Sequence, residues 1–347
     1  MKAMVLAAGV GSRLEPLTSQ VPKPLVPIAN RPVMEHILAL LKTHGITEVM
    51  SNLHYQPDKI QNHFGDGAKF GMNLHFHHEK ELSGDAGGVR ACKAFLQDST
   101  FIVLMGDLLT DANLNEVIAR HKEKKALATI AIKQVDDVSN FGVVLTNEKG
   151  FITGFQEKPK PAEALSNHAS TGIYILEPEV FKYIPASGSY GFGRQLFPLL
   201  VEKGLPVLAV PIDQYYWSDV GTIHQYRLSN FAALNHEANI VLAGKEESFG
   251  YVDTTAKISG QANIEGKLLI GKHSQIGPGV TIKGNVLIGD NCNIKANAHL
   301  EDTIVWSGST IGTDAQLTDC VVGYNCVIAD GTIQNEIASV SRAPSTV

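Results

Sequence analysis

Residues 4–27 read MVLAAGVGSRLEPLTSQVPKPLVP, and the rest of the chain is organised around them. Residues 4–8 are a short apolar run, which predicts a buried parallel strand. Gly9 and Gly11 follow at once, and glycine lets a backbone turn sharply and approach a ligand closely. The stretch therefore predicts a strand that leads directly into a glycine loop.

Two cations, Arg13 and Lys23, follow the glycine loop at separate points. The bare N–H groups of such a loop bind anionic oxygens, and Arg and Lys supply countercharge along a polyphosphate. Two familiar phosphate loops are excluded, because the stretch contains neither G-x-x-x-x-G-K-[ST] nor the third glycine of G-x-G-x-x-G. A glycine pair alone is also common in turns that bind nothing, so further motifs have to decide.

Strand-like and helix-like segments alternate over roughly the first third of the chain. The predicted strands cover residues 46–53, 74–78 and 101–105, and the predicted helices cover residues 33–43, 58–64 and 88–95. Such alternation predicts a doubly wound parallel sheet. Because ligands bind beyond the carboxyl ends of the strands, we expect the glycine loop, Gly106-Asp107 and the segment near Gly87 around one crevice.

The pattern changes over residues 126–176, where strand-like runs recur with few helices. These runs cover residues 128–134, 141–146, 152–156 and 172–176. We expect them to form a second lobe, which makes the predicted α/β sheet mixed and Rossmann-like overall. A helix near 195–202, a strand over 207–211 and a helix reaching about residue 235 complete a first domain predicted to cover residues 1–238.

Beyond about residue 252, an aliphatic residue recurs every six positions. The repeat runs through Ile258, Ile264, Ile270, Ile276, Ile282, Ile288, Ile294 and Leu300, and it resumes less regularly at Ile311, Leu317, Val322 and Ile328. Three such units make one triangular coil of a β-solenoid, so about five coils are expected. Glycines at 271, 277 and 289 suit the corners. The pattern resembles the left-handed parallel β-helix, predicted here over residues 252–340.

The formal net charge of −6 divides into −3 over residues 251–347 and −3 over the rest of the chain, so neither part is basic, which argues against a nucleic-acid partner. No run reaches the ~18 apolar residues of a membrane span, and the apolar start is too short for a signal peptide. We therefore expect a cytoplasmic protein without a membrane partner. The four cysteines form no C-x-x-C pair, which favours reduced thiols. The flat sides and ends of a β-helix predict a homo-oligomer built through residues 253–335.

Two aspartates stand at positions suited to a metal ion. Asp107 follows the predicted buried strand 101–105 through Gly106, and Asp219 lies in the string WSDVGT. Either could have an ordinary role, Asp107 as a helix cap and Asp219 in a turn. As a pair they suit Mg²⁺ bound to a triphosphate, because this ion takes one or two protein carboxylates and completes its shell with phosphate and water.

The strings L-A-A-G-x-G-S-R-L-x-P-L-T at 6–18 and P-K-P-L-V-P-I at 22–28 together resemble the signature of the sugar-1-phosphate nucleotidyltransferases, also called nucleotide-sugar pyrophosphorylases. Supporting motifs lie at 106–107, 155–159 and 216–222. The nearest subgroup is the bacterial mannose-1-phosphate guanylyltransferase-like proteins with a C-terminal left-handed β-helix. The resemblance implies that an NTP and a sugar 1-phosphate give an NDP-sugar and pyrophosphate.

The resemblance also implies a role for each matching residue. The catalytic residues are Arg13, Lys23, Asp107 and Asp219, the two aspartates being ligands of Mg²⁺. The nucleotide-binding residues are Leu6, Ala8, Gly9, Gly11, Arg13, Gly84, Asp85 and Gly87. The sugar-phosphate-binding residues are Gly142, Glu157, Lys158 and Thr171. Glu157 and Lys158 could instead form an exposed ion pair, although alternation along a strand would turn them to opposite faces.

Residues 81–87, ELSGDAG, resemble the base loop E-P-L-G-T-A-G of mannose-1-phosphate guanylyltransferases, with Asp85 in place of threonine. A carboxylate can accept the adjacent N1–H and N2–H of guanine together, whereas uracil and thymine offer N3–H alone. GTP and mannose 1-phosphate are therefore the favoured substrates. Asp85 could instead cap the helix that begins near Gly87. Gly191 is a second departure, because relatives often carry an acid there.

Three alternatives remain. Glucose-1-phosphate uridylyl- and thymidylyltransferases share nearly every motif, and they are the nearest alternative. A β-helix acyltransferase is less favoured, because His273 and His299 lie outside any recognisable catalytic motif. A catalytically dead sensor or scaffold is also less favoured, because a protein that only binds need not keep both metal carboxylates.

Overall fold

The computed structural model describes residues 1–339, and the chain divides into two compact units. The first contains Met1–Val10 and Met34–Asp219, and the second contains Gly11–Val33 and the chain from Val220 onward. The sequence-based division at about residue 238 followed the order of the chain. The compact units do not, because the short segment Gly11–Val33 groups with the C-terminal part.

The first unit is built on a nine-stranded mixed sheet in which the central strand β1 pairs in parallel with its two neighbours, β4 and β6. β11 is antiparallel to β6 and leads into the lobe of β8 to β10, as expected for a mixed doubly wound sheet. The strands are β1 (Lys2–Leu6), β4 (Glu48–Leu53), β5 (Asn73–His78), β6 (Phe101–Met105), β8 (Ala128–Gln134), β9 (Gly142–Thr146), β10 (Ile152–Glu157), β11 (His168–Leu176) and β12 (Val207–Pro211).

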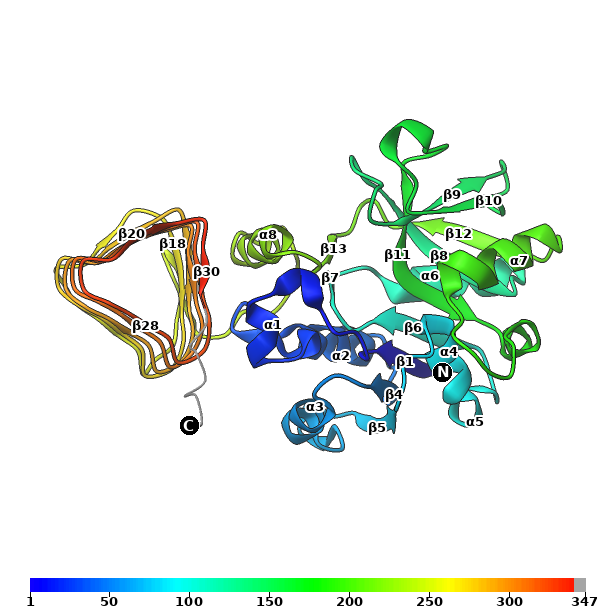
Figure 1. Ribbon diagram of the computed structural model, residues 1–347, viewed down its shortest axis with the longest axis horizontal. Coiled ribbons are helices and arrows are strands. Elements are labelled where there is room, and N and C mark those ends of the chain that lie inside the picture. Colours follow the sequence, from blue (N-terminus) through cyan, green and yellow to red (C-terminus); the bar gives the residue numbers. More distant parts are fainter. Residues whose placement is uncertain (340–347) are drawn as a thin grey trace. The chain divides into compact units, whose positions relative to one another are not determined.

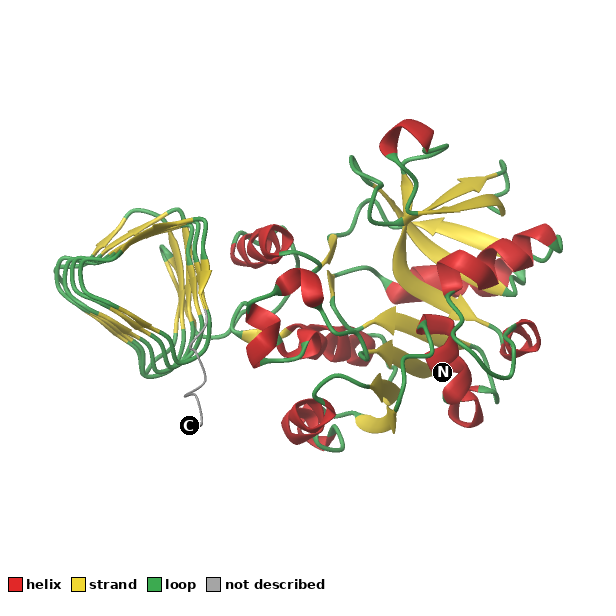
Figure 2. Ribbon diagram, viewed as in Figure 1, coloured by secondary structure: helices red, strands yellow, loops and turns green. Residues whose placement is uncertain are grey.

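Helices pack against this sheet, as Figure 2 shows. They are α2 (Val33–Thr43), α3 (Pro57–Phe64), α4 (Asp85–Ala91), α5 (Lys93–Leu96), α6 (Leu114–Lys124) and α7 (Phe197–Glu202). The helix predicted over 88–95 is two helices separated at Cys92, and a π-helical turn, η6 (Phe192–Leu196), precedes α7. Along residues 1–339, no helix combines the length and the apolar character that crossing a membrane requires.

The C-terminal part of the second unit is a left-handed β-helix with a triangular cross-section (Figure 1). Its first side holds β14 (Lys245–Glu247), β15 (Gly250–Val252), β18 (Lys267–Ile270), β21 (Asn285–Ile288), β24 (Ile304–Val305), β27 (Val321–Val322) and β30 (Ala338–Ser339). The second side holds β16 (Lys257–Ile258), β19 (Gln275–Ile276), β22 (Asn293–Ile294), β25 (Thr310–Ile311) and β28 (Val327–Ile328). The third side holds β17 (Asn263–Ile264), β20 (Thr281–Lys283), β23 (His299–Glu301), β26 (Gln316–Thr318) and β29 (Ile333–Asn335).

The six-residue repeat is confirmed by the pairing between coils. Ile258 pairs with Ile276 one coil later, and Ile276 pairs with Ile294. The loosened register after Leu300 has a simple cause: the corner between the third and first sides is one residue shorter in the later coils. Leu300 and Val305 are the paired aliphatics on either side of that corner, and they are five positions apart rather than six.

The glycines that follow the aliphatics serve close packing and not the chain reversal that the sequence suggested. A Cβ added at Gly289 would lie 2.5 Å from the backbone nitrogen of Ser307 in the next coil. The left-handed backbone conformation occurs instead at other residues, such as His273 and Asn291, whose φ angles are 57° and 55°. Gly289 is therefore required because two backbones approach each other there.

The first side of the β-helix is apolar on both faces. The inward row includes Ile270 and Ile288, whereas the outward row consists of Leu269, Leu287, Ile304 and Val321, all at most 2% exposed. Strand side chains alternate, so these outward residues need a cover of their own. Helix α8 (Ile223–Leu234) contacts β18 and β21, and it lies beside this side of the triangle in Figure 1.

Candidate functional site

The predicted phosphate loop begins where β1 ends. Leu6 lies opposite Asn52 of β4, and the N–H of Ala7 donates to Asn52 Oδ1 at 3.0 Å. Ala8 is buried, whereas Gly9 is exposed. The sheet therefore fixes the start of the loop and leaves its Gly9 end exposed, which suits a loop that receives a ligand.

The rest of the loop lies in the second unit and is braced internally. Gly11 has a left-handed φ of 74°, and its carbonyl accepts a hydrogen bond from Thr18 Oγ1 at 3.0 Å. A Cβ added at Gly11 would lie 3.1 Å from Lys23 Cβ. Glycine is thus required both for the backbone conformation and for the approach of Lys23. The turn η1 (Ser12–Leu14), which carries Arg13, begins at the next residue.

Two short strands bring Asp107 and Asp219 together. β7 (Leu108–Thr110) directly follows Asp107, and it pairs in antiparallel with β13 (Trp217–Asp219). Asp219 lies opposite Leu108, so the two aspartates are one residue apart in the register of this ladder. Over residues 1–339, no group of three or more His, Cys, Asp and Glu side chains could hold a metal ion. A pair of carboxylates fits an ion such as Mg²⁺, whose other ligands come from phosphate and water.

Strand β13 is positioned by its own indole ring. Trp217 Nε1 donates to the carbonyl oxygen of Thr171 at 2.8 Å, and its ring meets Phe141 edge-on with centroids 5.2 Å apart. Thr171 is buried, and its hydroxyl donates to the carbonyl of Ala131 at 2.7 Å. Thr171 therefore supports the strand that carries Asp219. Sequence reasoning assigned no role to Trp217 or Phe141, although both lie inside strings that it had singled out.

The predicted base loop is fastened to residues 190–192. The N–H of Gly87 donates to the carbonyl of Tyr190 at 3.0 Å, and the N–H of Tyr190 donates to the carbonyl of Ser83 at 2.8 Å. Gly84 has a left-handed φ of 77°, and a Cβ added there would lie 2.5 Å from the Tyr190 carbonyl oxygen. The predicted base loop and residues 190–192 are thus hydrogen-bonded to each other, and Gly84 is the residue that allows their backbones to approach so closely.

Asp85 joins the same two segments through its side chain. Its Oδ1 accepts hydrogen bonds from the N–H of Ala86 at 2.8 Å and from the N–H of Phe192 at 2.7 Å. Burial raises the pKa of Asp85, and the two N–H groups together with the Lys158 ammonium oppose that rise. Helix α4 begins at Asp85 itself and its N-cap residue is Gly84, so Asp85 is not the N-cap that the sequence suggested. Its carboxylate bridges two loops instead, and the base-reading role stays a prediction. No pattern in the sequence announces this bridge, because its second partner is a backbone N–H.

The carboxylate of Glu157 lies close to two glycines, Gly142 and Gly193, which leave room for it. It ends β10 opposite Gly142, and a Cβ added at Gly142 would lie 3.1 Å from Glu157 Oε2. A Cβ added at Gly193 would lie 3.0 Å from Glu157 Cδ, so this second glycine also makes room for the carboxylate. Burial raises the pKa of Glu157, the Lys158 ammonium lowers it, and the Asp85 carboxylate raises it further. Gly193 was missed from the sequence, where only the neighbouring Gly191 stood out.

Lys158 has a left-handed backbone, with φ of 50°, which is uncommon for a residue with a side chain. Its N–H donates to the carbonyl of Phe141 at 3.0 Å, and the residue is exposed. The strand ends at Glu157, so strand alternation does not separate the two side chains as the sequence suggested. The first unit therefore places an exposed ammonium next to a half-buried carboxylate.

The predicted site residues are divided between the two units. Gly11, Arg13 and Lys23 belong to the second unit, and all the others belong to the first. The chain passes from one unit to the other at Val10–Gly11, at Val33–Met34 and at Asp219–Val220. Two of these crossings thus fall within the motifs that predicted the site.

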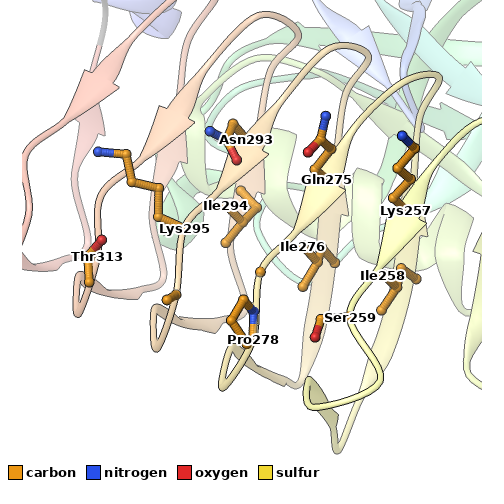
Figure 3. Close-up of a pocket in the computed structure, with 12 residues that line it drawn as sticks. Lys257, Ile258, Ser259, Gln275, Ile276, Pro278, Asn293, Ile294, Lys295 and Thr313 are labelled. Carbon is orange, nitrogen blue, oxygen red and sulfur yellow. The ribbon is translucent and has the colours of Figure 1, made fainter.

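A hollow of about 530 Å³ lies on the second side of the β-helix, over β16, β19 and β22 (Figure 3). Lys257, Gln275 and Lys295 are among the residues that line it. Lys295 Nζ lies 3.2 Å from Asp330 Oδ1 and is thereby already paired. None of the predicted site residues lines this hollow.

Comparison with known proteins gives concordant results. The nucleotidyl transferase family model matches residues 2–235, and the model of the EIF2B subunit epsilon LbH domain matches residues 247–343. A UTP–glucose-1-phosphate uridylyltransferase from Synechocystis sp. is 40% identical, covering 95% of this chain and 89% of that protein. A mannose-1-phosphate guanyltransferase from Emericella nidulans is 32% identical, covering 96% and 94%. A Bacillus anthracis crystal structure assigned as a glucose-1-phosphate thymidylyltransferase is 26% identical, covers 71% of this chain and 98% of its own, and has a TM-score of 0.62.

Replacing Asp85 should separate its charge from its hydrogen bonds. Asp85→Asn keeps an oxygen that can accept both N–H groups, so we expect the variant to be at least as stable as the wild type at pH 7.5. Burial raises the pKa of the native carboxyl, so the wild type binds a proton more tightly when it is folded. The free energy of unfolding of the wild type should therefore rise relative to that of the variant as the pH falls. Asp85→Ala, which loses both hydrogen bonds, should cost about 1 to 3 kcal/mol.

Thermal unfolding of the three proteins at pH 7.5 and pH 5.5 measures this, with the exposed Asp98→Asn as the control. An Asn variant that melts several degrees below the wild type at pH 7.5 would contradict the account, because the ionised carboxylate would then itself be stabilising.

Proposed function

Because this chain belongs to the nucleotidyl transferase family, as a sugar-1-phosphate nucleotidyltransferase, we propose that it joins UTP to glucose 1-phosphate and releases UDP-glucose and pyrophosphate. In this reaction a phosphate oxygen of the sugar attacks the α-phosphorus of the nucleotide. A new P–O–P bond forms, and the bond from the α-phosphorus to the bridging oxygen breaks. Pyrophosphate leaves with that electron pair.

Two observations support this pair of substrates. The uridylyltransferase from Synechocystis is 40% identical to this chain, whereas the mannose-1-phosphate guanyltransferase from Emericella is 32% identical. In addition, Asp85 Oδ1 already accepts two backbone N–H groups. A carboxylate tied down in this way is poorly placed to accept the two adjacent donors of guanine.

GTP and mannose 1-phosphate are the second candidate pair. The observation in their favour is the loop ELSGDAG, which keeps the glycines and the alanine of the guanylyltransferase loop and adds a carboxylate at Asp85. Under this alternative Asp85 would turn toward the base and give up its hydrogen bond with Phe192 when the nucleotide binds.

The residues of the chain are proposed to act by positioning and charge. A phosphate monoester has a second pKa near ~6 and is already an anion at neutral pH, so no general base is required. Gly9 and Gly11 present N–H groups to the phosphates of the nucleotide, and Arg13 and Lys23 offset the charge on the α-phosphate and the departing pyrophosphate. Each of these contacts lowers the activation free energy most when it faces an oxygen on which negative charge develops during the transfer.

The sugar phosphate is proposed to bind at the paired groups that end β10. Lys158 is exposed and carries the positive charge, so it would hold the phosphate. Glu157 would accept hydrogen bonds from sugar hydroxyls, and Gly142 and Gly193 keep its carboxylate free of steric crowding. Asp107 and Asp219 would hold Mg²⁺, which supplies neutralisation of phosphate charge when it is bound.

The test of this function is the release of pyrophosphate from a panel of four NTPs and several sugar 1-phosphates, with the NDP-sugar confirmed by mass. We expect the highest kcat/KM for UTP with glucose 1-phosphate. A higher kcat/KM for GTP with mannose 1-phosphate would establish the second candidate pair instead. Absence of pyrophosphate release from every pair would contradict the proposed function.

Removal of either proposed metal ligand should abolish most of the activity. Asp107→Asn and Asp219→Asn should each lower kcat by at least ~100-fold, because each removes one charged ligand from a step that depends on electrostatics. Circular dichroism should be unchanged, and Asp98→Asn on the surface serves as the matched control. If either variant retains near-normal turnover at low Mg²⁺, its aspartate is not a ligand.

Lys158→Ala should act on one substrate only. We expect KM for the sugar 1-phosphate to rise at least ~10-fold, about 1.4 kcal/mol, while KM for the NTP changes by less than ~2-fold. Initial rates measured with each substrate varied in turn give both constants, and Lys160→Ala is an exposed lysine two positions away that serves as the control. Equal increases in both constants would contradict the assignment.

A further inference from the structure

The segment that carries Arg13 and Lys23 is attached to the β-helix at two points. The side-chain amide of Gln20 pairs with the backbone of Tyr324 in both directions: Nε2 donates to the carbonyl at 3.1 Å, and Oε1 accepts from the N–H at 3.0 Å. Ten residues later, Asn30 Nδ2 donates to the carbonyl of Ile288 at 2.7 Å. Lys23 lies between these two attachment points, and Arg13 lies just before the first.

The segment is also braced by contacts between its own residues. Gln20 ends the short helix α1 (Leu17–Gln20), and Thr18 in that helix donates to the carbonyl of Gly11 at 3.0 Å. Lys23 Cβ packs at the position that a side chain at Gly11 would occupy. A displacement at Gln20 would therefore be passed to the turn that holds Arg13 and to the stem of Lys23.

Helix α8 holds the same segment from a third direction. The N–H of Ala29 donates to Asn230 Oδ1 at 2.9 Å. Helix α8 is itself bound to the β-helix, because Trp306 Nε1 donates to the Tyr226 hydroxyl at 2.7 Å. Trp306 also stacks at a tilt on Tyr324, the partner of Gln20, with ring centroids 4.8 Å apart. The backbone that receives Gln20 is therefore part of a packed aromatic cluster and not a free corner.

We propose that the β-helix positions the two phosphate-binding cations of the catalytic reaction, and that Gln20 is the positioning residue that transmits this. The inference rests on the proposed function for the identity of the ligand, a nucleoside triphosphate. It gives the β-helix a direct part in catalysis beyond any role in assembly. Gln20 itself touches the backbone of Tyr324 and acts on the substrate only through Arg13 and Lys23.

The test compares Gln20→Ala with Gln316→Ala, an exposed glutamine on β26, a strand on another side of the same β-helix. In Gln20→Ala, we expect kcat to fall about 5- to 20-fold and KM for the NTP to rise at least ~3-fold, with KM for the sugar 1-phosphate unchanged. A residue that only supported the fold would lower the active fraction and leave both KM values unchanged. Gln316→Ala should match the wild type.

Hydrogen exchange of the amides over residues 12–26 gives a second readout that needs no activity. We expect faster exchange in Gln20→Ala than in the wild type or in Gln316→Ala. Unchanged exchange, or equal increases in both KM values, would overturn the inference. If the wild type releases no pyrophosphate from any pair, the proposed function fails, whereas the exchange comparison still decides whether Gln20 orders the segment.

Discussion

Burial of one outward-facing apolar row holds the second unit together. Leu269, Leu287, Ile304 and Val321 point away from the interior of the β-helix and are nevertheless buried. Covering side chains of this size is worth about 1.5 to 3 kcal/mol each, whereas a hydrogen bond contributes about 1 kcal/mol. The apolar row therefore attaches the neighbouring segments to the β-helix, and polar contacts such as that of Gln20 set their position.

The rest of the site is assembled by backbone pairing between short segments. β7 and β13 bring Asp107 and Asp219 into one ladder, and residues 83–87 pair with residues 190–192 around Asp85. Glycines stand where these segments meet, as at Gly84, because a side chain there would meet a backbone carbonyl. The candidate site thus depends on close approach of main chains, and charged residues stand at the ends of the elements so joined, as Asp219 does at the end of β13.

The sequence was most informative where a period is encoded in it. The six-residue repeat predicts the pairing of Ile258 with Ile276, and an apolar run predicts β6. Three-residue strands such as β13 carry no period, and a bond from a side chain to a distant N–H, as from Asp85 to Phe192, leaves no pattern. The first side of the β-helix, which is buried on both faces, did leave a pattern in the sequence. Leu268, Leu269 and Ile270 are three consecutive apolar residues, where one inward aliphatic per side was expected.

The central claim is that the chain transfers a nucleotidyl group directly between two phosphates, through positioning and charge alone. The configuration at the α-phosphorus tests this most directly, with a nucleotide that carries one sulfur of known configuration on its α-phosphate. A single in-line displacement inverts that centre, so the account predicts an NDP-sugar of inverted configuration. Net retention would contradict it, because retention requires two displacements and hence a covalent nucleotidyl-enzyme formed by a nucleophilic side chain.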